Sequence, residues 1–390
     1  MMEFADILHR CFRCGYCKFP NNYQDFNCPS YSKFRFETYS PGGRMWVLRA
    51  WLNGELKTTP RLAEILFSCA TCGNCVEHCV FPKFKDDILH AFLAAREEMV
   101  NQGTVPPAVR DYLKALQVHG NPYRLPAGER GKWQDGLGLE LYSGQEYLFH
   151  AGCVGSLDER GMKMARSVAG LLKKLEVSFG ILGTKENCDG NEALFLGEKG
   201  VFNSLVERNI QEFQSRGVKK VIALSPHAYH AFKNDYPKNS YPFEVFHYTQ
   251  ILAMQSKKLM GLCSQPGLRI TYHDPCYLGR HNKEYQAPRK ILKSISGLQL
   301  LEMGRVKENA FCCGGGGGNF FTDLLGSGPE SPARGRIREA AETGASILAV
   351  ACPNCAKMLE DAAKAENLEG KIAVKEISEL IQEHRAEGIA

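Results

Sequence analysis

Residues 270–279 read ITYHDPCYLG, in which a run typical of a buried β-strand leads into a His-x-x-Cys motif that ends at Cys276. The stretch YLFHAGCVGS at 147–156 has the same plan, with Cys153 in the matching place. A pattern that recurs at a long interval is the mark of a duplicated structural unit. These two stretches predict that most of the chain consists of one unit used twice.

Two further pairs of stretches extend this duplication. GTKENCDG at 183–190 matches KENAFCCGGG at 307–316, and VIALSPHAYHAF at 221–232 matches ILAVACPNCAKM at 347–358. In each copy short apolar strands alternate with amphipathic helices, which is typical of an α/β domain with a short parallel sheet. We expect the first copy to occupy residues 146–262 and the second copy to occupy residues 263–390.

The two copies differ in their cysteines. The second copy offers five thiols: Cys276, Cys312, Cys313, Cys352 and Cys355. The first copy keeps Cys153 and Cys188, and has Asp189, Ser225 and Ala228 where the other thiols would be. Because the carboxyl ends of parallel strands meet at one edge of a sheet, we expect the thiols of one copy to converge. Five converging thiols are enough to hold a metal cluster, whereas two are not.

The N-terminal third carries two more groups of cysteines. They are Cys11, Cys14, Cys17 and Cys28, followed by Cys69, Cys72, Cys75 and Cys79. CxxCxxC spacing is typical of cubane 4Fe-4S clusters, and in two-cluster ferredoxins the remote fourth cysteine serves the other cluster. We therefore predict one cubane cluster on Cys11, Cys14, Cys17 and Cys79, and another on Cys69, Cys72, Cys75 and Cys28. Structural zinc is the alternative, but paired CxxC zinc sites have no need of a third cysteine at the same interval.

The segments around these cysteines favour helices. Apolar residues recur at helical spacing in 86–103, and residues 106–120 begin with two prolines and end with a glycine, as helices commonly do. We expect a mainly helical, ferredoxin-like domain over residues 1–122. Residues 123–145 are rich in glycine, proline and charge, which favours a linker.

Composition narrows the class of protein. The chain has 390 residues, of which 44% are hydrophobic and 23% are charged, and this composition is typical of a globular protein. Its net charge is +5 and it has no basic stripe, so the sequence gives no support to nucleic-acid binding. No apolar run approaches the roughly 20 residues of a membrane-spanning helix. Sixteen cysteines spaced as ligands favour a reducing cytoplasm, with any membrane attachment made through a partner subunit.

Two CxxCxxC motifs followed by paired Cys…CysCysGly…CysProxCys units resemble the cysteine-rich CCG-domain iron–sulfur oxidoreductases. The resemblance is to the D-type subunit of heterodisulfide reductase and to the glycolate oxidase iron–sulfur subunit. It implies an α/β tandem repeat of two CCG-type domains, the first degenerate, preceded by the two-cluster ferredoxin-like domain. It also implies that Cys276, Cys312, Cys313, Cys352 and Cys355 hold a noncubane 4Fe-4S cluster and are the catalytic cysteines.

The same resemblance implies a function in electron transfer. In that family the two sulfurs of a disulfide are captured at the noncubane cluster while electrons arrive from the ferredoxin-like domain. The implied partners are flavoprotein, haem-containing or other iron–sulfur subunits, with a small thiol or disulfide as substrate. The alternative is an electron relay between a flavoprotein or haem partner and another redox subunit, without a substrate of its own.

Several residues outside the ligand sets also receive an interpretation. We expect the glycines at 314–318 to leave clearance over the cluster, and His150 and His273 to have a structural role at the strand ends. Cys263 fits no ligand set and is interpreted as an idle thiol, and Cys153 and Cys188 as vestiges of a lost centre. An entrance for an anionic substrate is a weaker hypothesis for the following residues: Arg280, His281, Lys283, Arg305, Lys307 and Lys357.

Overall fold

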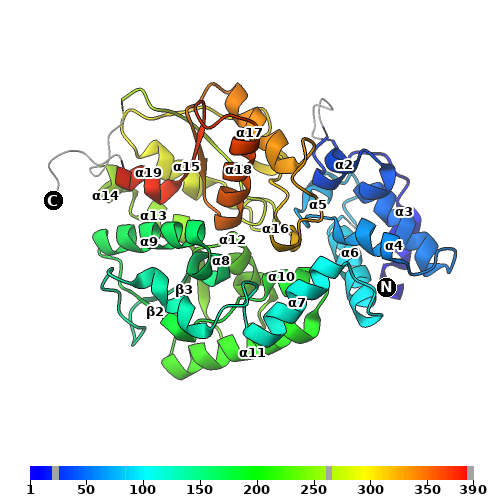
Figure 1. Cartoon of the computed structure of the whole chain (residues 1–390), viewed down its shortest axis with the longest axis horizontal. Coiled ribbons are helices and arrows are strands. Elements are labelled where there is room, and N and C mark those ends of the chain that lie inside the picture. The colour runs from blue at the N-terminus through cyan, green and yellow to red at the C-terminus, as the bar shows by residue number, and fades with distance from the viewer. Residues whose placement is uncertain (20–25, 84, 261–265, 384–390) are drawn as a thin grey trace.

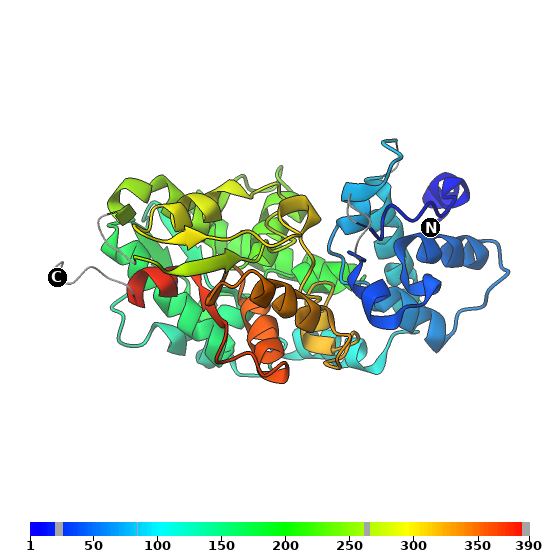
Figure 2. The same cartoon turned by 90° about the horizontal axis from the view of Figure 1, so that it is seen from above.

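The computed structural model describes residues 1–19, 26–83, 85–260 and 266–383. Figure 1 shows the helices of the N-terminal third at one end of the molecule, and the two copies of the repeated unit beside each other, the first in green and the second in yellow to red. Seen from above in Figure 2, the last helix lies at the far end from the N-terminal helices. Cys263 lies outside the described residues.

The N-terminal third is helical, as predicted. Its helices are α1 (Ala5–Arg10), α2 (Pro29–Phe34), α3 (Pro41–Leu52), α4 (Pro60–Phe67), α5 (Asn74–His78), α6 (Asp87–Asn101) and α7 (Pro107–His119), with short 3-10 turns η1 (Met2–Phe4) and η2 (Glu37–Tyr39). Ser40 and Thr59 cap α3 and α4 by accepting a hydrogen bond from a backbone N–H of the first turn. Gly120 ends α7 in the left-handed conformation, which glycine adopts without strain.

The first copy contains a four-stranded parallel sheet of order β2-β1-β3-β4. Its elements are β1 (Tyr147–His150), α8 (Gly152–Leu157), α9 (Glu159–Lys174), β2 (Phe179–Ile181), η4 (Gly183–Lys185), α10 (Asn191–Phe195), α11 (Lys199–Arg216), β3 (Lys220–Ala223), α12 (Pro226–His230), η5 (Ala231–Asp235), β4 (Glu244–His247) and α13 (Tyr248–Met254). The short helix α14 (Ser256–Met260) follows.

The second copy repeats this topology in a sheet of order β6-β5-β7-β8. Its elements are β5 (Arg269–Tyr272), α15 (Gln286–Lys293), β6 (Gln299–Leu300), η6 (Lys307–Asn309), α16 (Asn319–Thr322), α17 (Pro332–Glu342), β7 (Ile347–Val350), α18 (Pro353–Ala365), β8 (Ala373–Glu376) and α19 (Ile377–Glu383). The two identical strand orders confirm the predicted fold class of tandem α/β units.

The sequence predicted the central strands of each sheet and missed those beside them. β1, β3, β5 and β7 are almost wholly buried, which is why they read as short apolar runs. The flanking strands are shorter or partly exposed, and β6 contains only 2 residues. Such short segments carry too few residues for any periodicity to be recognised.

The segment predicted as a linker packs closely against the first copy. It contains the 3-10 helix η3 (Ala127–Gln134), whose Trp133 ring contacts Phe149 of β1 with 5.8 Å between the ring centroids. Arg130 and Trp133 are both buried, at 4% and 3% exposure. Glycine and proline in this segment therefore shape a covering loop over the first sheet.

The two copies share one hydrophobic core. A single cluster of buried side chains includes Phe149 and Ile222 of the first sheet and Tyr272 and Ala349 of the second. At its rim Arg160 of α9 donates hydrogen bonds to Glu360 and Glu379 of the second copy. The relative position of the two sheets is therefore fixed by packing as well as by ion pairs.

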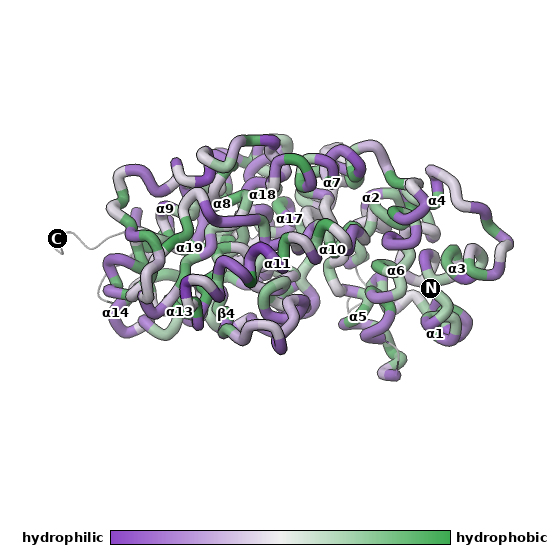
Figure 3. The backbone as a smooth tube through the Cα atoms, turned by 90° about the horizontal axis from the view of Figure 1, so that it is seen from below, coloured by the Kyte–Doolittle hydropathy of each residue, from purple (hydrophilic) through white to green (hydrophobic). Residues whose placement is uncertain are grey.

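No helix in the described ranges is long and apolar enough to cross a membrane. Figure 3 shows hydrophilic and hydrophobic residues alternating along helices such as α11, as expected of helices that pack on one side only.

A buried carboxyl group joins the two copies at the carboxyl edge of the second sheet, where Glu376 of β8 lies beside Val350 of β7. Tyr248 of α13 donates a hydrogen bond to Glu376 at the end of β8, and the Ser378 backbone N–H donates another at 2.8 Å. Burial, and then the charge of Glu379, raise the pKa of Glu376 to about 7, and the hydrogen bonds offset this only in part. Since the folded-state pKa lies above the ordinary value of 4.5, the stability from this group is full below pH 4.5 and is lost as the pH rises through 7.

We predict that Glu376→Gln makes the protein more resistant to unfolding than the wild type above pH 7, by up to about 3 kcal/mol, because the amide stays neutral. The apparent thermal midpoint of the anaerobic protein, recorded at one scan rate between pH 5.5 and 8.5, measures the effect. Glu383→Gln, on the exposed end of α19, is the matched control and should follow the wild type. Parallel pH profiles for Glu376→Gln and the wild type would refute the prediction.

Candidate metal centres

The first predicted ligand set lies around one small cavity near the N-terminus. Its four cysteines, Cys11, Cys14, Cys17 and Cys79, all line this cavity. Apolar side chains, including Met45 and Ile88, form the rest of the wall. Trp46 donates a hydrogen bond to the Cys11 carbonyl at 2.7 Å, and the Cys14 side chain is exposed. The structure brings together the four thiols that spacing and crossed ligation predict, and places one of them at the surface.

The second predicted set lies deeper. Burial raises the pKa of the Cys75 thiol well above its usual value, and neighbouring cysteines raise it further, among them Cys69, Cys72 and Cys28. Cys17 of the first set lies near Cys75 and Cys28 of the second set, so the two sets are adjacent. The Thr71 N–H donates to the Cys69 sulfur at 3.4 Å, the kind of hydrogen bond that holds cluster ligands in place.

The five cysteines of the second copy converge at the carboxyl edge of its sheet. The Sγ atoms of Cys276 and Cys312 are 3.7 Å apart, and those of Cys313 and Cys355 are 3.4 Å apart. Burial raises the pKa of Cys352, but hydrogen bonds with Cys355 and His227 outweigh it and bring the pKa to about 6. All five side chains are buried, at 8% exposure or less. Buried sulfurs this close, one of them favoured as thiolate, fit an iron–sulfur cluster.

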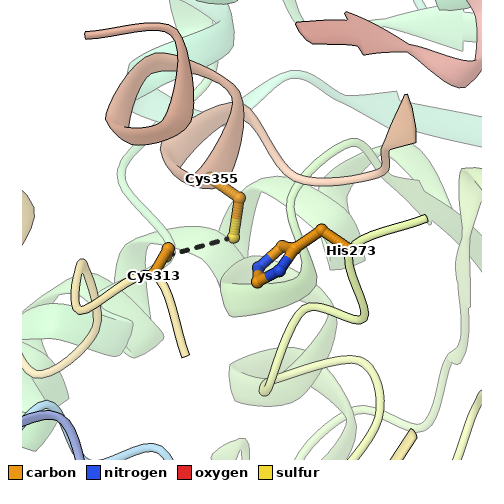
Figure 4. Close-up of side chains that lie close together, drawn as sticks. All are labelled: His273, Cys313 and Cys355. Atoms are coloured by element: carbon orange, nitrogen blue, oxygen red, sulfur yellow. Dashed lines mark hydrogen bonds between the residues drawn. The ribbon is translucent and has the colours of Figure 1, made fainter. Parts of the chain in front are cut away.

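His273 belongs to this group of sulfurs. Figure 4 shows its imidazole beside Cys313 and Cys355, and the ligand atoms of the three residues lie within 4.8 Å of one another. The Arg336 Nε donates to Nδ1 of His273 at 3.1 Å, which leaves the ring proton of the neutral imidazole on Nε2. The pKa of Cys313 is lowered well below its usual value, mainly by Cys312 and Cys355 and in part by the nearby imidazole of His273. The sequence predicts a structural role for this histidine, and the structure adds a contact with the predicted cluster ligands.

His227 reaches the second copy from the first, and sequence reasoning missed it. It lies at the start of α12, hydrogen-bonds to Cys352, and pairs with Glu192 of α10. Burial lowers the pKa of His227, but the Glu192 charge and the two hydrogen bonds outweigh this and raise it to about 10. The only signal in the sequence is its place in SPHA, where the second copy has Asn354 in CPNC.

Gly316 and Gly317 pack against the N-terminal third, which corrects the expectation of clearance over the cluster at these two positions. A methyl group on Gly316 would lie 2.6 Å from the Ala70 carbonyl oxygen, and one on Gly317 would lie 2.7 Å from that of Cys69. Gly318 meets Leu196 of the first copy in the same way. The glycines let the backbone of this loop touch the backbone of the Cys69–Cys72 loop, a contact that side chains would prevent.

Arg280 holds the same two loops together and does not form an entrance. It is 5% exposed and donates hydrogen bonds to the carbonyls of Cys72 at 2.7 Å and Ala310 at 2.6 Å. Cys312, from the other loop, is the first cause that raises the pKa of the Cys72 thiol beside it.

The other basic residues of the entrance hypothesis are scattered. Lys283 pairs with Glu77, Lys357 with Asp158, and Arg305 with Glu339. His281 bonds to the Thr71 carbonyl, and the backbone N–H of Lys307 donates to Asp274. The Lys283, Lys357 and His281 contacts cross between domains, whereas the Arg305–Glu339 and Lys307–Asp274 contacts lie within the second copy, so these contacts do not define one common entrance.

We predict that Gly316→Ala lowers stability by about 1–3 kcal/mol, because its methyl group would press on the Ala70 carbonyl and force the two loops apart. Thermal unfolding of the anaerobic protein measures this loss. Gly304→Ala is the matched control, since its methyl group would find its nearest neighbour 4.0 Å away. Equal thermal midpoints for the two variants would count against the close packing of the loops.

Comparison with known protein families matches three parts of the chain. The model of the 4Fe-4S dicluster domain matches residues 7–81. The model of the cysteine-rich domain matches twice, over residues 147–233 and 270–360, which are the two copies of the α/β unit. The cysteines of each predicted ligand set lie inside these matched regions.

Three known proteins are similar to this chain in sequence. The "Probable iron-sulfur-binding oxidoreductase FadF" of Bacillus subtilis is 36% identical over 82% of this chain and 46% of its own length. The EtfAB:quinone oxidoreductase of Syntrophomonas wolfei is 31% identical over 96% of this chain and 58% of its own length. The D-type subunit of the dihydromethanophenazine:CoB–CoM heterodisulfide reductase of Methanosarcina barkeri is 31% identical over 96% of this chain and 93% of its own length.

The chain spans about half the length of the first two of these relatives and nearly all of the third. Its alignment with the third relative therefore runs over nearly the whole of both chains. The chain belongs to the family of cysteine-rich-domain iron–sulfur oxidoreductases that carry an N-terminal 4Fe-4S dicluster domain.

Proposed function

We propose that this chain is the electron-transfer part of a larger redox enzyme and moves electrons between two cubane 4Fe-4S clusters and a noncubane centre on the five cysteines of the second copy. The observation that carries the proposal is the packing of the Cys69–Cys72 loop against the loop that holds Cys312, where Arg280 donates hydrogen bonds to the carbonyls of Cys72 and Ala310. It joins the second cubane ligand set directly to the noncubane set. Iron–sulfur clusters, when bound, transfer single electrons at potentials set by their protein surroundings.

The arrangement of the thiols supports a linear path. Cys14 is exposed, so a partner docked at the first ligand set exchanges electrons there. Cys17 of that set neighbours Cys28 of the second, and Cys72 of the second contacts Cys312 of the third. Thr71 N–H and Gly314 N–H donate to sulfurs along this path and favour their anionic form.

Disulfide reduction is the reaction that we propose at the noncubane end. Its support is the likeness to the D-type subunit of heterodisulfide reductase, which covers nearly the whole of both chains. The five sulfurs and His273 lie at the end of the proposed path where the substrate would react. Reduction of a disulfide needs two electrons, and the path would deliver them one at a time.

A relay without its own substrate is the second candidate. The observation in its favour is the burial of the five thiols, over which the glycine run is packed against the Cys69–Cys72 loop. In this case a flavoprotein, haem-containing or other iron–sulfur subunit supplies or collects the electrons. Such a partner would also provide any attachment to a membrane. The likeness to an EtfAB:quinone oxidoreductase, a longer protein, is in keeping with this arrangement.

We expect anaerobically purified protein to contain about twelve irons per chain, for three 4Fe-4S clusters. Cys313→Asp copies the Cys188–Asp189 pair of the first copy and should lower this number to about eight, with loss of the noncubane electron paramagnetic resonance signal and retention of both cubane signals. Elemental analysis and spectra of the same samples measure both quantities. A noncubane signal that survives the substitution would show that the ligand set is wrong, and zinc in place of iron would refute the whole assignment.

The two candidate reactions differ in their response to disulfides. If disulfide reduction is correct, adding small disulfides or thiols to the protein should change the noncubane signal and leave the cubane signals as they were. A reduced flavoprotein partner should reduce the clusters in either case and serves as the positive control. If the flavoprotein reduces the clusters but no disulfide changes the noncubane signal, disulfide reduction is excluded. The electron relay would then be the remaining candidate function.

A further inference from the structure

The first copy retains two thiols that the proposed electron path does not use. Cys153 follows β1 and Cys188 precedes α10, and both are buried, at 7% and 6% exposure. They line one wall of a cavity of about 40 Å³. His227 and Asn354, which belong to the two copies, line another part of the same cavity.

A buried arginine is directed at one of these thiols. The Arg130 Nη2 donates a hydrogen bond to the Cys153 sulfur at 3.0 Å. Its Nη1 has no hydrogen-bond partner among the described residues and lies 3.6 Å from the Glu186 carboxylate. This guanidinium, which is 4% exposed, pairs with the Glu186 carboxylate and also favours a thiolate at Cys153.

The two thiols also bond to each other and divide their protons unequally. The hydrogen bond with Cys188 lowers the pKa of Cys153, burial opposes this, and Arg130 lowers the pKa further. The same hydrogen bond, together with burial, raises the pKa of Cys188 well above its usual value. These shifts favour a thiolate at Cys153 over one at Cys188, and a thiolate next to a thiol is the reactive form of a dithiol redox pair.

A metal ion is the less suitable occupant. In the described part of the chain, one group of three His, Cys, Asp or Glu residues has its ligand atoms together, and it is His273, Cys313 and Cys355. No third His, Cys, Asp or Glu ligand atom lies within 4.8 Å of both thiols in the described residues, whereas a disulfide bond requires only the two thiols that line this cavity.

The pair lies next to the five-cysteine set. His227 lines the cavity of the pair and hydrogen-bonds to Cys352 on its other side. Asn354, which also lines the cavity, lies in the first turn of α18 between Cys352 and Cys355. One layer of side chains thus separates the pair from the proposed noncubane centre.

We propose that Cys153 and Cys188 form a reversible dithiol–disulfide couple that exchanges electrons with the centre on the five cysteines. The inference rests on the proposed function for the presence of that centre. On oxidation the Cys188 S–H bond breaks and one S–S bond forms, so the pair releases one proton and two electrons, which the iron–sulfur clusters accept singly. Reduction by the clusters returns both electrons and one proton. The couple links one-electron clusters to two-electron chemistry inside a single chain.

Thiol trapping on the complete, cluster-loaded protein tests the couple. The protein is equilibrated anaerobically with mixtures of reduced and oxidised dithiothreitol, quenched in acid and unfolded. Free thiols are then alkylated with a light reagent, the disulfides are reduced, and the newly released thiols are alkylated with a heavy reagent. Trypsin, cutting after Lys132 and Arg160 and after Lys185 and Lys199, places each cysteine alone in one peptide. We expect the two peptides to oxidise together with a two-electron dependence, and to appear as one linked species when reduction is omitted.

Variants separate the couple from its link to the clusters. In Cys188→Ser, Cys153 should stay reduced over the same mixtures. Arg130→Gln should make the couple about tenfold harder to keep reduced, since the guanidinium stabilises the thiolate form. Cys352→Ser should leave the equilibrium with dithiothreitol unchanged and slow reduction of the disulfide by reduced methyl viologen about tenfold or more, because the route through the clusters is broken.

Failure of this inference is distinguishable from failure of the proposed function. If Cys153 and Cys188 stay reduced, or are protected by a bound metal, in protein that shows the noncubane signal, the couple is refuted and the proposed function stands. If the disulfide forms but Cys352→Ser does not slow its reduction, the link to the centre is refuted. Protein without a noncubane signal would refute the proposed function itself.

Discussion

The contact of the Cys69–Cys72 loop with the glycine run at 314–318 is the constraint on which the rest of the molecule depends. Gly316 and Gly317 bring backbone against backbone, and no side chain could take their place without forcing the loops apart. Arg280 bonds to carbonyls on both loops from a buried position. This contact puts Cys72 beside Cys312, and so sets the separation of two ligand sets that are far apart in the chain.

Buried arginines balance the negative charge that thiolate ligands would bring into the core. Arg44 donates to the carbonyls of Ile65 and Tyr39 near Cys28. Arg96 donates to the carbonyls of Cys69 in the N-terminal third and Phe195 in the first copy, and burial lowers its pKa to about 10. Because an unpaired buried charge is very costly, such guanidinium groups in turn favour anionic neighbours. Arg130 has the same effect on Cys153 in the first copy.

The duplication has produced two copies with different tasks. The second copy carries the five thiols, while the first has other residues in three of these places and contributes His227 and Glu192 to the neighbourhood of Cys352. Glu192 also accepts a hydrogen bond from the Gly318 N–H, so it links the first copy to the glycine run. A copy that looks degenerate by its cysteines is therefore part of the surroundings of the complete one, and its remaining thiols lie in a cavity between the two.

The sequence by itself determined the tandem α/β plan and the helical N-terminal third, and it predicts the composition of the ligand sets, because strand–helix alternation and cysteine spacing are local properties of a chain. It missed the edge strands, such as the 2-residue β6, which are too short to show a period. Only the tertiary structure decided that the glycine run is a packing surface, that Arg130 of the expected linker reaches Cys153, and that His227 serves the other copy. Each of these depends on which surfaces meet when the domains pack, and such contacts between residues far apart in the chain leave no periodic trace in the sequence.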